Sequence, residues 1–226
     1  MSSIKLGFFG SQKVEILMYL ARILKNLNFK VLVIDASLEQ NLKFSVPNSL
    51  NLNEIEYRDI KYFIERDSIN MIKSDDYSDF DYILMDFGFN YSLVSELTVC
   101  DQIFLITDFN KFNVYRTKKF VEKIIENNDE LKLVRIFKDY ISGNIKKKYI
   151  DHLIFNGNED IIIEKYEFPL LEKEVQNKYS SQYMDIFKIN KISKELASFL
   201  KDILFETTQK KEKEIDNAFK LARKGK

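Results

Sequence analysis

The residues with the clearest capacity for chemistry stand where apolar runs of the sequence end. Asp35 follows the apolar run 31–34, and Asp86 ends the run 80–86. A carboxylate in such a place can hold a water on Mg²⁺ or can cap the turn that follows, and both interpretations stay open. Before the first helical segment, the turn Gly10-Ser11-Gln12-Lys13-Val14 brings one glycine and one lysine together. This turn follows the first apolar run, so it stands in the same kind of position as the two acids.

The composition excludes several other kinds of site. The single histidine, His152, argues against a histidine metal site or a Ser-His-Asp triad, and the single cysteine, Cys100, excludes an internal disulfide and a zinc cluster. We predict a surface position for His152 and a core position for Cys100. The 35 basic residues balance 35 acidic ones, so the chain lacks the basic surplus typical of nucleic-acid-binding proteins. The basic run 146–148 is interpreted as a solvated face.

Alternating strands and helices must position these residues. Residues 4–9 form a short apolar run that stops at a glycine, as a buried strand does before a turn. Residues 16–27 carry apolar side chains at helical spacing, and residues 31–34 form a second apolar run. Together they make a strand–helix–strand unit of about thirty residues, the size of a βαβ crossover. Further strands are predicted at 80–86, 100–107, 131–137 and 161–164, and further helices at 114–126 and 189–205.

Continuous apolar strands that alternate with helices are typical of a parallel sheet covered on both faces. The predicted fold class is α/β: a three-layer, mostly parallel sheet with helices on both faces over residues 1–205, plus a C-terminal helical tail over 206–226. Residues 57–60 and 69–72 fit short strands and helical turns equally, so the structure and strand order of residues 40–78 stay open. Ligands of such a sheet bind at the carboxyl ends of the strands, where the candidate residues fall.

The order of these elements resembles the MinD/ParA family of P-loop ATPases, which includes CpaE/TadZ-type pilus localisation proteins. Residues 5–13, 30–37, 81–88 and 100–107 carry the resemblance, which spans about residues 4–205. It implies a P-loop NTPase-like fold, ATP and Mg²⁺ as the family's cofactors, and a homodimer formed through the site face. The family's nucleotide-binding positions fall on Gly10, Ser11, Gln12, Lys13, Val14, Asp86 and Gly88.

The phosphate loop departs from the family pattern K-G-G-x-x-K-T/S. The double glycine is absent, so the set of backbone N–H groups that surrounds phosphates is incomplete, and Val14 replaces the hydroxyl that coordinates Mg²⁺. Ser37 stands where the family places an acid that handles the attacking water. Asp35 and Asp86 are then vestiges of the catalytic set. We therefore expect no catalytic residue and no required cofactor; if Mg²⁺ binds, Asp86 is its ligand.

Two further groups of residues have alternative interpretations. Residues 209–226 contain seven Lys or Arg and three Asp or Glu, with apolar side chains at helical spacing; this tail is predicted to contact a protein partner or a membrane, or else to be solvated. The contact residues are Ile215, Phe219, Ala222, Lys220, Arg223 and Lys224. A cluster of aromatic residues near the site, Phe8, Phe9, Phe87, Phe89 and Tyr91, is predicted to be core that fills the space of an ATP; a partner-binding patch and adenine stacking are the alternatives.

The sequence thus predicts a catalytically degenerate MinD/ParA-like protein, a pseudo-ATPase that acts as a scaffold or localisation factor through protein–protein contacts. No apolar run reaches the roughly 18 residues of a membrane span, and the N-terminus lacks a signal-peptide pattern. We therefore expect a cytoplasmic homodimer, with peripheral contact to the inner face of the membrane left open. Two alternatives remain: a divergent ATPase with an ATP-dependent monomer–dimer cycle, and a DNA-partition or conjugation accessory protein.

Overall fold

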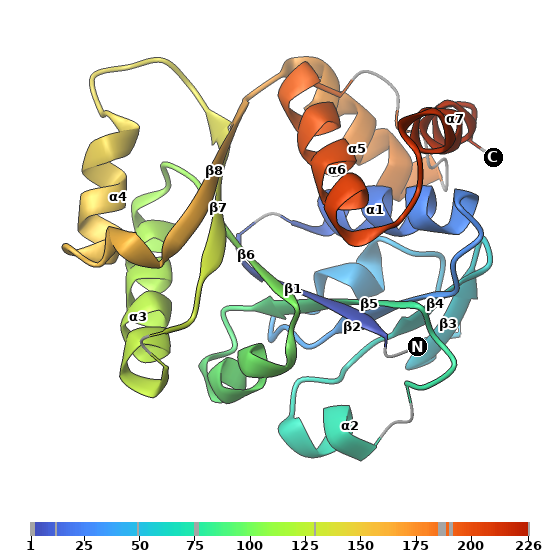
Figure 1. Ribbon diagram of the computed structural model, residues 1–226, viewed down its shortest axis with the longest axis horizontal. Coiled ribbons are helices and arrows are strands. Elements are labelled where there is room, and N and C mark those ends of the chain that lie inside the picture. Colours follow the sequence, from blue (N-terminus) through green and yellow to red (C-terminus); the bar gives the residue numbers. More distant parts are fainter. Residues whose placement is uncertain are drawn as a thin grey trace.

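A computed structural model of the protein describes residues 3–11, 13–48, 50–74, 77–128, 130–184, 189 and 192–225. Its centre is an eight-stranded sheet (Figure 1). The strands are β1 (Ile4–Gly10), β2 (Val31–Asp35), β3 (Glu54–Tyr57), β4 (Ile60–Phe63), β5 (Tyr82–Gly88), β6 (Gln102–Thr107), β7 (Leu133–Tyr140) and β8 (Ile162–Pro169). They lie in the order β3-β4-β2-β5-β1-β6-β7-β8, and neighbouring strands are parallel except β3 with β4. The predicted α/β class with a mostly parallel sheet is confirmed.

Helices cover both faces of this sheet. They are α1 (Val14–Asn26), α2 (Ile69–Ser74), α3 (Lys111–Asn127), α4 (Lys147–Phe155), α5 (Glu172–Met184), α6 (Lys194–Thr207) and α7 (Glu212–Arg223), with the 3₁₀ helices η1 (Asn41–Phe44), η2 (Tyr91–Val99) and η3 (Glu159–Ile161). Helices α1, α6 and α7 share one hydrophobic cluster, and α3 and α4 share the other. In Figure 1, α5 lies beside α6 and α1 on the first of these sides. The three-layer arrangement is therefore as predicted.

Both faces of the central strands are buried. Along β1, Leu6 and Phe8 belong to the cluster that contains α1, whereas Phe9 belongs to the cluster that contains α3. Successive side chains of a strand point to opposite faces. A strand covered on both faces therefore needs a continuous apolar run, which is the pattern that identified β1, β2 and β5 in the sequence.

The segment 40–78 contains a hairpin and a short helix. Strands β3 and β4 pair antiparallel, and the two residues between them, Arg58 and Asp59, have φ values of 54° and 58°. Two successive residues with positive φ are characteristic of a type I′ hairpin turn. Strand β4 then pairs parallel with β2, so the hairpin forms one edge of the sheet. Residues 69–72 lie in α2.

Helix α5 was not predicted from the sequence. Its residues are mostly polar, and none of residues 172–183 is buried. Apolar periodicity is the main sequence signal of a helix that packs on a core, and α5 has no such stripe. The predicted helix 189–205 corresponds to α6, which begins at Lys194 after an N-cap in which the hydroxyl of Ser193 accepts from Leu196 N (3.1 Å).

The C-terminal tail packs on the rest of the chain. Helix α7 buries Ile215, Ala218, Phe219 and Ala222 in the cluster that contains α1, and Asn26 Nδ2 donates to Ala218 O (3.2 Å). The structure thus corrects the expectation that Ile215, Phe219 and Ala222 face outward as a contact surface. An amphipathic stripe looks the same in a sequence whether it meets the chain's own core or a foreign surface. The charged residues of that expected surface, Lys220, Arg223 and Lys224, are exposed.

Within the described residues, no helix combines the length and the apolar character that crossing a membrane requires.

Candidate functional site

The candidate site lies where β1, β2, β5 and β6 end and α1 begins. Gly10 closes β1 with a φ of +103°, and a Cβ built there would lie 1.9 Å from Ile106 O on the neighbouring strand. Only glycine fits this conformation and this close approach. The backbone N–H of Ser11 donates to the same carbonyl (3.2 Å). The turn is therefore tied to β6 and reaches α1 within residues 11–13; Gln12 is outside the described residues.

Lys13 forms a buried ion pair within this turn. Its Nζ lies 2.9 Å from Asp86 Oδ1 and donates to Gly10 O (2.7 Å), and both charged side chains are almost fully buried. Gly88 N donates to the same aspartate oxygen (2.8 Å). Burial raises the pKa of Asp86, and the ammonium of Lys13 opposes that rise. The structure brings Lys13, Asp86 and Gly88 together as expected, but their polar groups are directed at one another.

Asp35 lies opposite Asp86 in the pairing of β2 with β5. Its Oδ1 accepts from the backbone N–H (3.1 Å) and the hydroxyl (2.6 Å) of Ser37, and its Oδ2 accepts from Leu42 N (3.0 Å). Burial, followed by the nearby charge of Asp86, raises the pKa of Asp35 to about 6. Asp35 therefore caps the turn after β2, and Ser37 donates to it.

Asp108 is a third acid at this edge; it lies in one of the predicted strand ends but was not among the predicted site residues. Ser11 Oγ and Asn113 Nδ2 each donate to its Oδ2 (2.8 Å), and Asn110 N donates to its Oδ1 (2.8 Å). These bonds tie the turn after β1 to the start of α3. Its position directly after a predicted strand was the available signal, because the carboxyl ends of parallel strands meet at one edge.

Glu15 places a carboxylate in the first turn of α1, and it was also missed. Its Oε1 lies 2.6 Å from Lys138 Nζ at the end of β7, and its Oε2 lies 3.6 Å from Lys178 Nζ on α5. Burial works against ionisation, but Lys138 and Lys178 hold the pKa of Glu15 below its usual value. A helix N-terminus attracts anions. In this protein the carboxylate of Glu15 supplies that anion.

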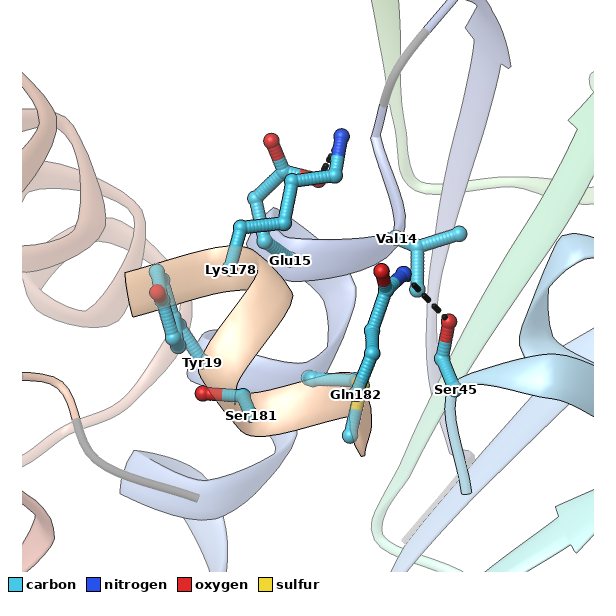
Figure 2. A pocket seen from close by; sticks show the side chains of 8 residues that line it. Val14, Glu15, Tyr19, Ser45, Lys178, Ser181 and Gln182 are labelled. Carbon is cyan, nitrogen blue, oxygen red and sulfur yellow. Dashed lines mark hydrogen bonds and ion pairs between the residues drawn. The ribbon is translucent and has the colours of Figure 1, made fainter. Parts of the chain in front are cut away.

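Helix α5 crosses the start of α1, as Figure 2 shows. Lys178 reaches toward Glu15, and Gln182 Nε2 donates to Ser45 Oγ (3.3 Å). The hollow between these residues measures about 20 Å³, which is room for roughly one water molecule. Val14, the first residue of α1, is buried beside it. The start of α1 is thus covered by side chains of the same chain.

The aromatic residues near the site pack against other core residues, whereas the idea that they fill the space of an ATP stays a prediction. Phe8 stacks on Phe104 with ring centroids 4.7 Å apart, and Phe9 stacks on Phe120 at 4.4 Å. Phe87 is completely buried. Two further members of the cluster are Phe89, which lies under the guanidinium of Arg116, and Tyr91, which is half-buried against Phe120.

Structural comparison shows which class of protein has this fold. No protein-family model and no curated protein sequence matches the chain. Solved structures do match it: the sheet order and the helices are those of the ParA and MinD P-loop ATPases, so the expected P-loop NTPase-like fold is confirmed.

Three of these structures show how far the likeness extends. A ParA family ATPase from Chlorobium tepidum TLS matches with a TM-score of 0.61 and 14% identity, over 88% of this chain and 99% of that one. MinD in the MinC:MinD cell division protein complex of Aquifex aeolicus matches with a TM-score of 0.53 and 14% identity, over 93% and 99%. Cobyrinic acid a,c-diamide synthase from Mycobacterium smegmatis matches with a TM-score of 0.54 and 12% identity, over 92% and 96%. At these identities the likeness shows the fold alone, and one fold can host different activities.

The fold implies a nucleoside triphosphate with Mg²⁺, and the residues present do not fit that group. Lys13 and Asp86 neutralise each other, Val14 has no hydroxyl, and Lys138 and Lys178 are paired with Glu15. Within the described residues, no three His, Cys, Asp or Glu side chains gather as a metal site.

Proposed function

We propose that this protein is a non-hydrolysing relative of the ParA and MinD ATPases that acts as a scaffold or localisation factor through protein–protein contacts. The observation that carries the proposal is the buried pair of Lys13 and Asp86, with an Nζ–Oδ1 distance of 2.9 Å. Phosphoryl transfer depends on positioning and on charge stabilisation of the phosphates by such groups. Here the charges of Lys13 and Asp86 neutralise each other inside the protein.

The acid at the start of α1 supports the same conclusion. A bound phosphate would lie close to the carboxylate of Glu15, which the ammonium of Lys138 holds in place at 2.6 Å. Lys138 and Lys178 are both paired with Glu15. A phosphate would have to compete with this carboxylate for the two ammonium groups.

The rim of the site offers a surface for a second copy of the chain. Phe44 of η1 (74% exposed) and Phe112 (69%) and Tyr115 (60%) of α3 are large exposed side chains. Exposed apolar side chains of this size are suited to a protein contact. We propose a homodimer through this face. That MinD forms a complex with MinC is support for a role based on protein contacts.

The test of lost catalysis is ATP hydrolysis with Mg²⁺ by the purified protein and by Asp86→Ala. We expect equal, background release of phosphate from both, and no heat of ATP binding at millimolar nucleotide. Turnover that Asp86→Ala abolishes would overturn the proposal. The dimer is tested separately by light scattering: Phe112→Glu with Tyr115→Glu should give a monomer, whereas Tyr183→Glu, on exposed α5, should not.

A divergent ATPase with an ATP-dependent monomer–dimer cycle is the second candidate. Its support is that Lys13 and Asp86 remain at the family positions, so that a nucleotide would have to separate them. Removing one partner of a buried pair costs about 3–5 kcal/mol, which corresponds to a weakening of ATP binding of at least about a hundredfold. This candidate predicts that ATP doubles the mass of the particle and that Lys13→Ala prevents the change.

A further inference from the structure

A cavity of about 400 Å³ lies between α5 and the rest of the protein. Its size is in the range of small-molecule binding sites. Side chains from α1, from the end of β7 and from α5 line most of it. The lining residues are Glu15 and Tyr19 of α1, Lys138 and Asp139 of β7, Leu170 after β8, Glu174, Val175, Lys178 and Tyr179 of α5, and Ile192 and Leu196. Charged groups and apolar side chains thus line the same cavity.

The charges that line this cavity favour a cation. Three carboxylates, those of Glu15, Asp139 and Glu174, face two ammonium groups, those of Lys138 and Lys178. The ammonium of Lys138 is already held between Glu15 Oε1 (2.6 Å) and Asp139 Oδ2 (2.9 Å). Lys178 lies 3.6 Å from the second oxygen of Glu15. The lining therefore carries one negative charge in excess, which repels anionic ligands.

Glu174 is the acid of this lining that forms no ion pair. Its Oε1 accepts from Ser193 N, and no lysine, arginine or histidine of the described chain lies within ion-pair distance of it. Burial raises the pKa of Glu174, and the hydrogen bonds from Ser193 and the more distant charge of Lys138 only partly oppose that rise. A cation in contact with the carboxylate would lower the pKa further.

The apolar part of the lining complements such a cation. Leu170, Val175, Ile192 and Leu196 surround the cavity, together with the ring of Tyr179. Aliphatic side chains accept an apolar body, and the face of a tyrosine ring attracts an ammonium group. We propose that this cavity binds a small organic cation, a primary ammonium group carried on an apolar or aromatic body, with Glu174 as its counter-ion.

Helix α5 is the cover through which this ligand enters. None of residues 172–183 is buried, and the contacts that tie α5 down are polar. Asn177 Nδ2 donates to Tyr19 Oη (3.3 Å), Gln182 Nε2 donates to Ser45 Oγ (3.3 Å), and Lys178 pairs with Glu15. Polar contacts of this kind exchange readily with water. Lifting α5 breaks them and exposes Val14 and Met18 of α1, which α5 covers.

The proposal is tested with tyramine and with tyrosol, its neutral alcohol analogue, by calorimetry on the full chain. A hydrogen bond between charged groups contributes about 1.5–3 kcal/mol, so tyrosol should bind at least about tenfold more weakly than tyramine. Glu174→Gln should weaken tyramine binding by a similar factor. Glu195→Gln, which removes an exposed acid from α6 outside the cavity, should leave the affinity unchanged.

A second variant and a second measurement guard against an effect of misfolding. Val175→Trp fills the cavity from the exposed side of the fold and should abolish tyramine binding while circular dichroism stays unchanged. Tyramine should also slow amide hydrogen exchange in α5. Equal affinity for tyramine and tyrosol, no tyramine binding at millimolar concentration, or unchanged binding in Glu174→Gln would each overturn the proposal. These outcomes are independent of ATP hydrolysis, so they do not bear on the proposed function.

Discussion

The substitution Phe219→Ala tests whether α7 packs on the rest of the chain or is free to bind an outside partner. The side chain of Phe219 is 2% exposed and lies in the hydrophobic cluster with α1. Truncating a buried phenylalanine removes its transfer free energy and leaves a cavity, which together cost about 3–5 kcal/mol of stability. Leu221, on the same helix, is 41% exposed, so Leu221→Ala is the matched control and should cost less than about 1 kcal/mol.

The assay is urea unfolding followed by circular dichroism, with a thermal scan beside it. For a chain of this size each kcal/mol shifts Tm by about 2–4 °C, so Phe219→Ala should melt roughly 6–20 °C lower than the parent. The decrease in the free energy of unfolding cannot exceed the free energy with which α7 packs on the rest of the chain. Once that free energy is used up, the whole helix detaches. In that case trypsin cleaves α7 early while the sheet stays folded.

The reasoning is refuted if Phe219→Ala behaves like Leu221→Ala and α7 is no easier to cleave. Such a result would mean that the apolar stripe of α7 is free in solution. Ile215, Phe219 and Ala222 would then be available to an outside partner.

Three further outcomes are expected. Gly10→Ala forces a Cβ to within 1.9 Å of a carbonyl oxygen at a positive φ and should cost more than about 3 kcal/mol in urea unfolding, whereas Gly143→Ala meets no atom within 4 Å and should be neutral. The pKa of Asp35 is raised from 3.8 to about 6, so the stability that this carboxyl contributes is present below pH 3.8 and is lost as the pH rises through 6. The free energy of unfolding of Asp35→Asn should therefore rise relative to that of the parent by up to about 3 kcal/mol between pH 4 and pH 7. A constant difference between the two proteins across that range would contradict the assignment. Lys13→Met leaves Asp86 charged and buried and should cost about 3–5 kcal/mol, most of which Lys13→Met with Asp86→Leu should restore; a double variant no more stable than the single one would show that the pair is not the cause.

Part of the candidate site could be read from the sequence. Gly10, Asp35 and Asp86 were located because each stands at the end of an apolar run, and Lys13 because it lies in the turn after the first run; such runs are local. The acids that hold the site together were not all found, since Glu15 was not selected. Its partners, Lys138 and Lys178, are more than a hundred residues away along the chain, and no local pattern connects them.

The sequence was enough to predict the central strands, the helices α1, α3 and α6, and the edge of the sheet where polar residues gather, but not the segment 40–78 or helix α5. Hydrophobic periodicity depends only on neighbours along the chain, so it survives without knowledge of the fold. Only the tertiary structure decided what those residues meet. Lys13 pairs with Asp86, Glu15 takes the start of α1, and the stripe of α7 meets α1 because burial and ion pairing depend on segments brought together from far apart. The same lysine could bind a phosphate or neutralise an aspartate, and its surroundings make it do the second.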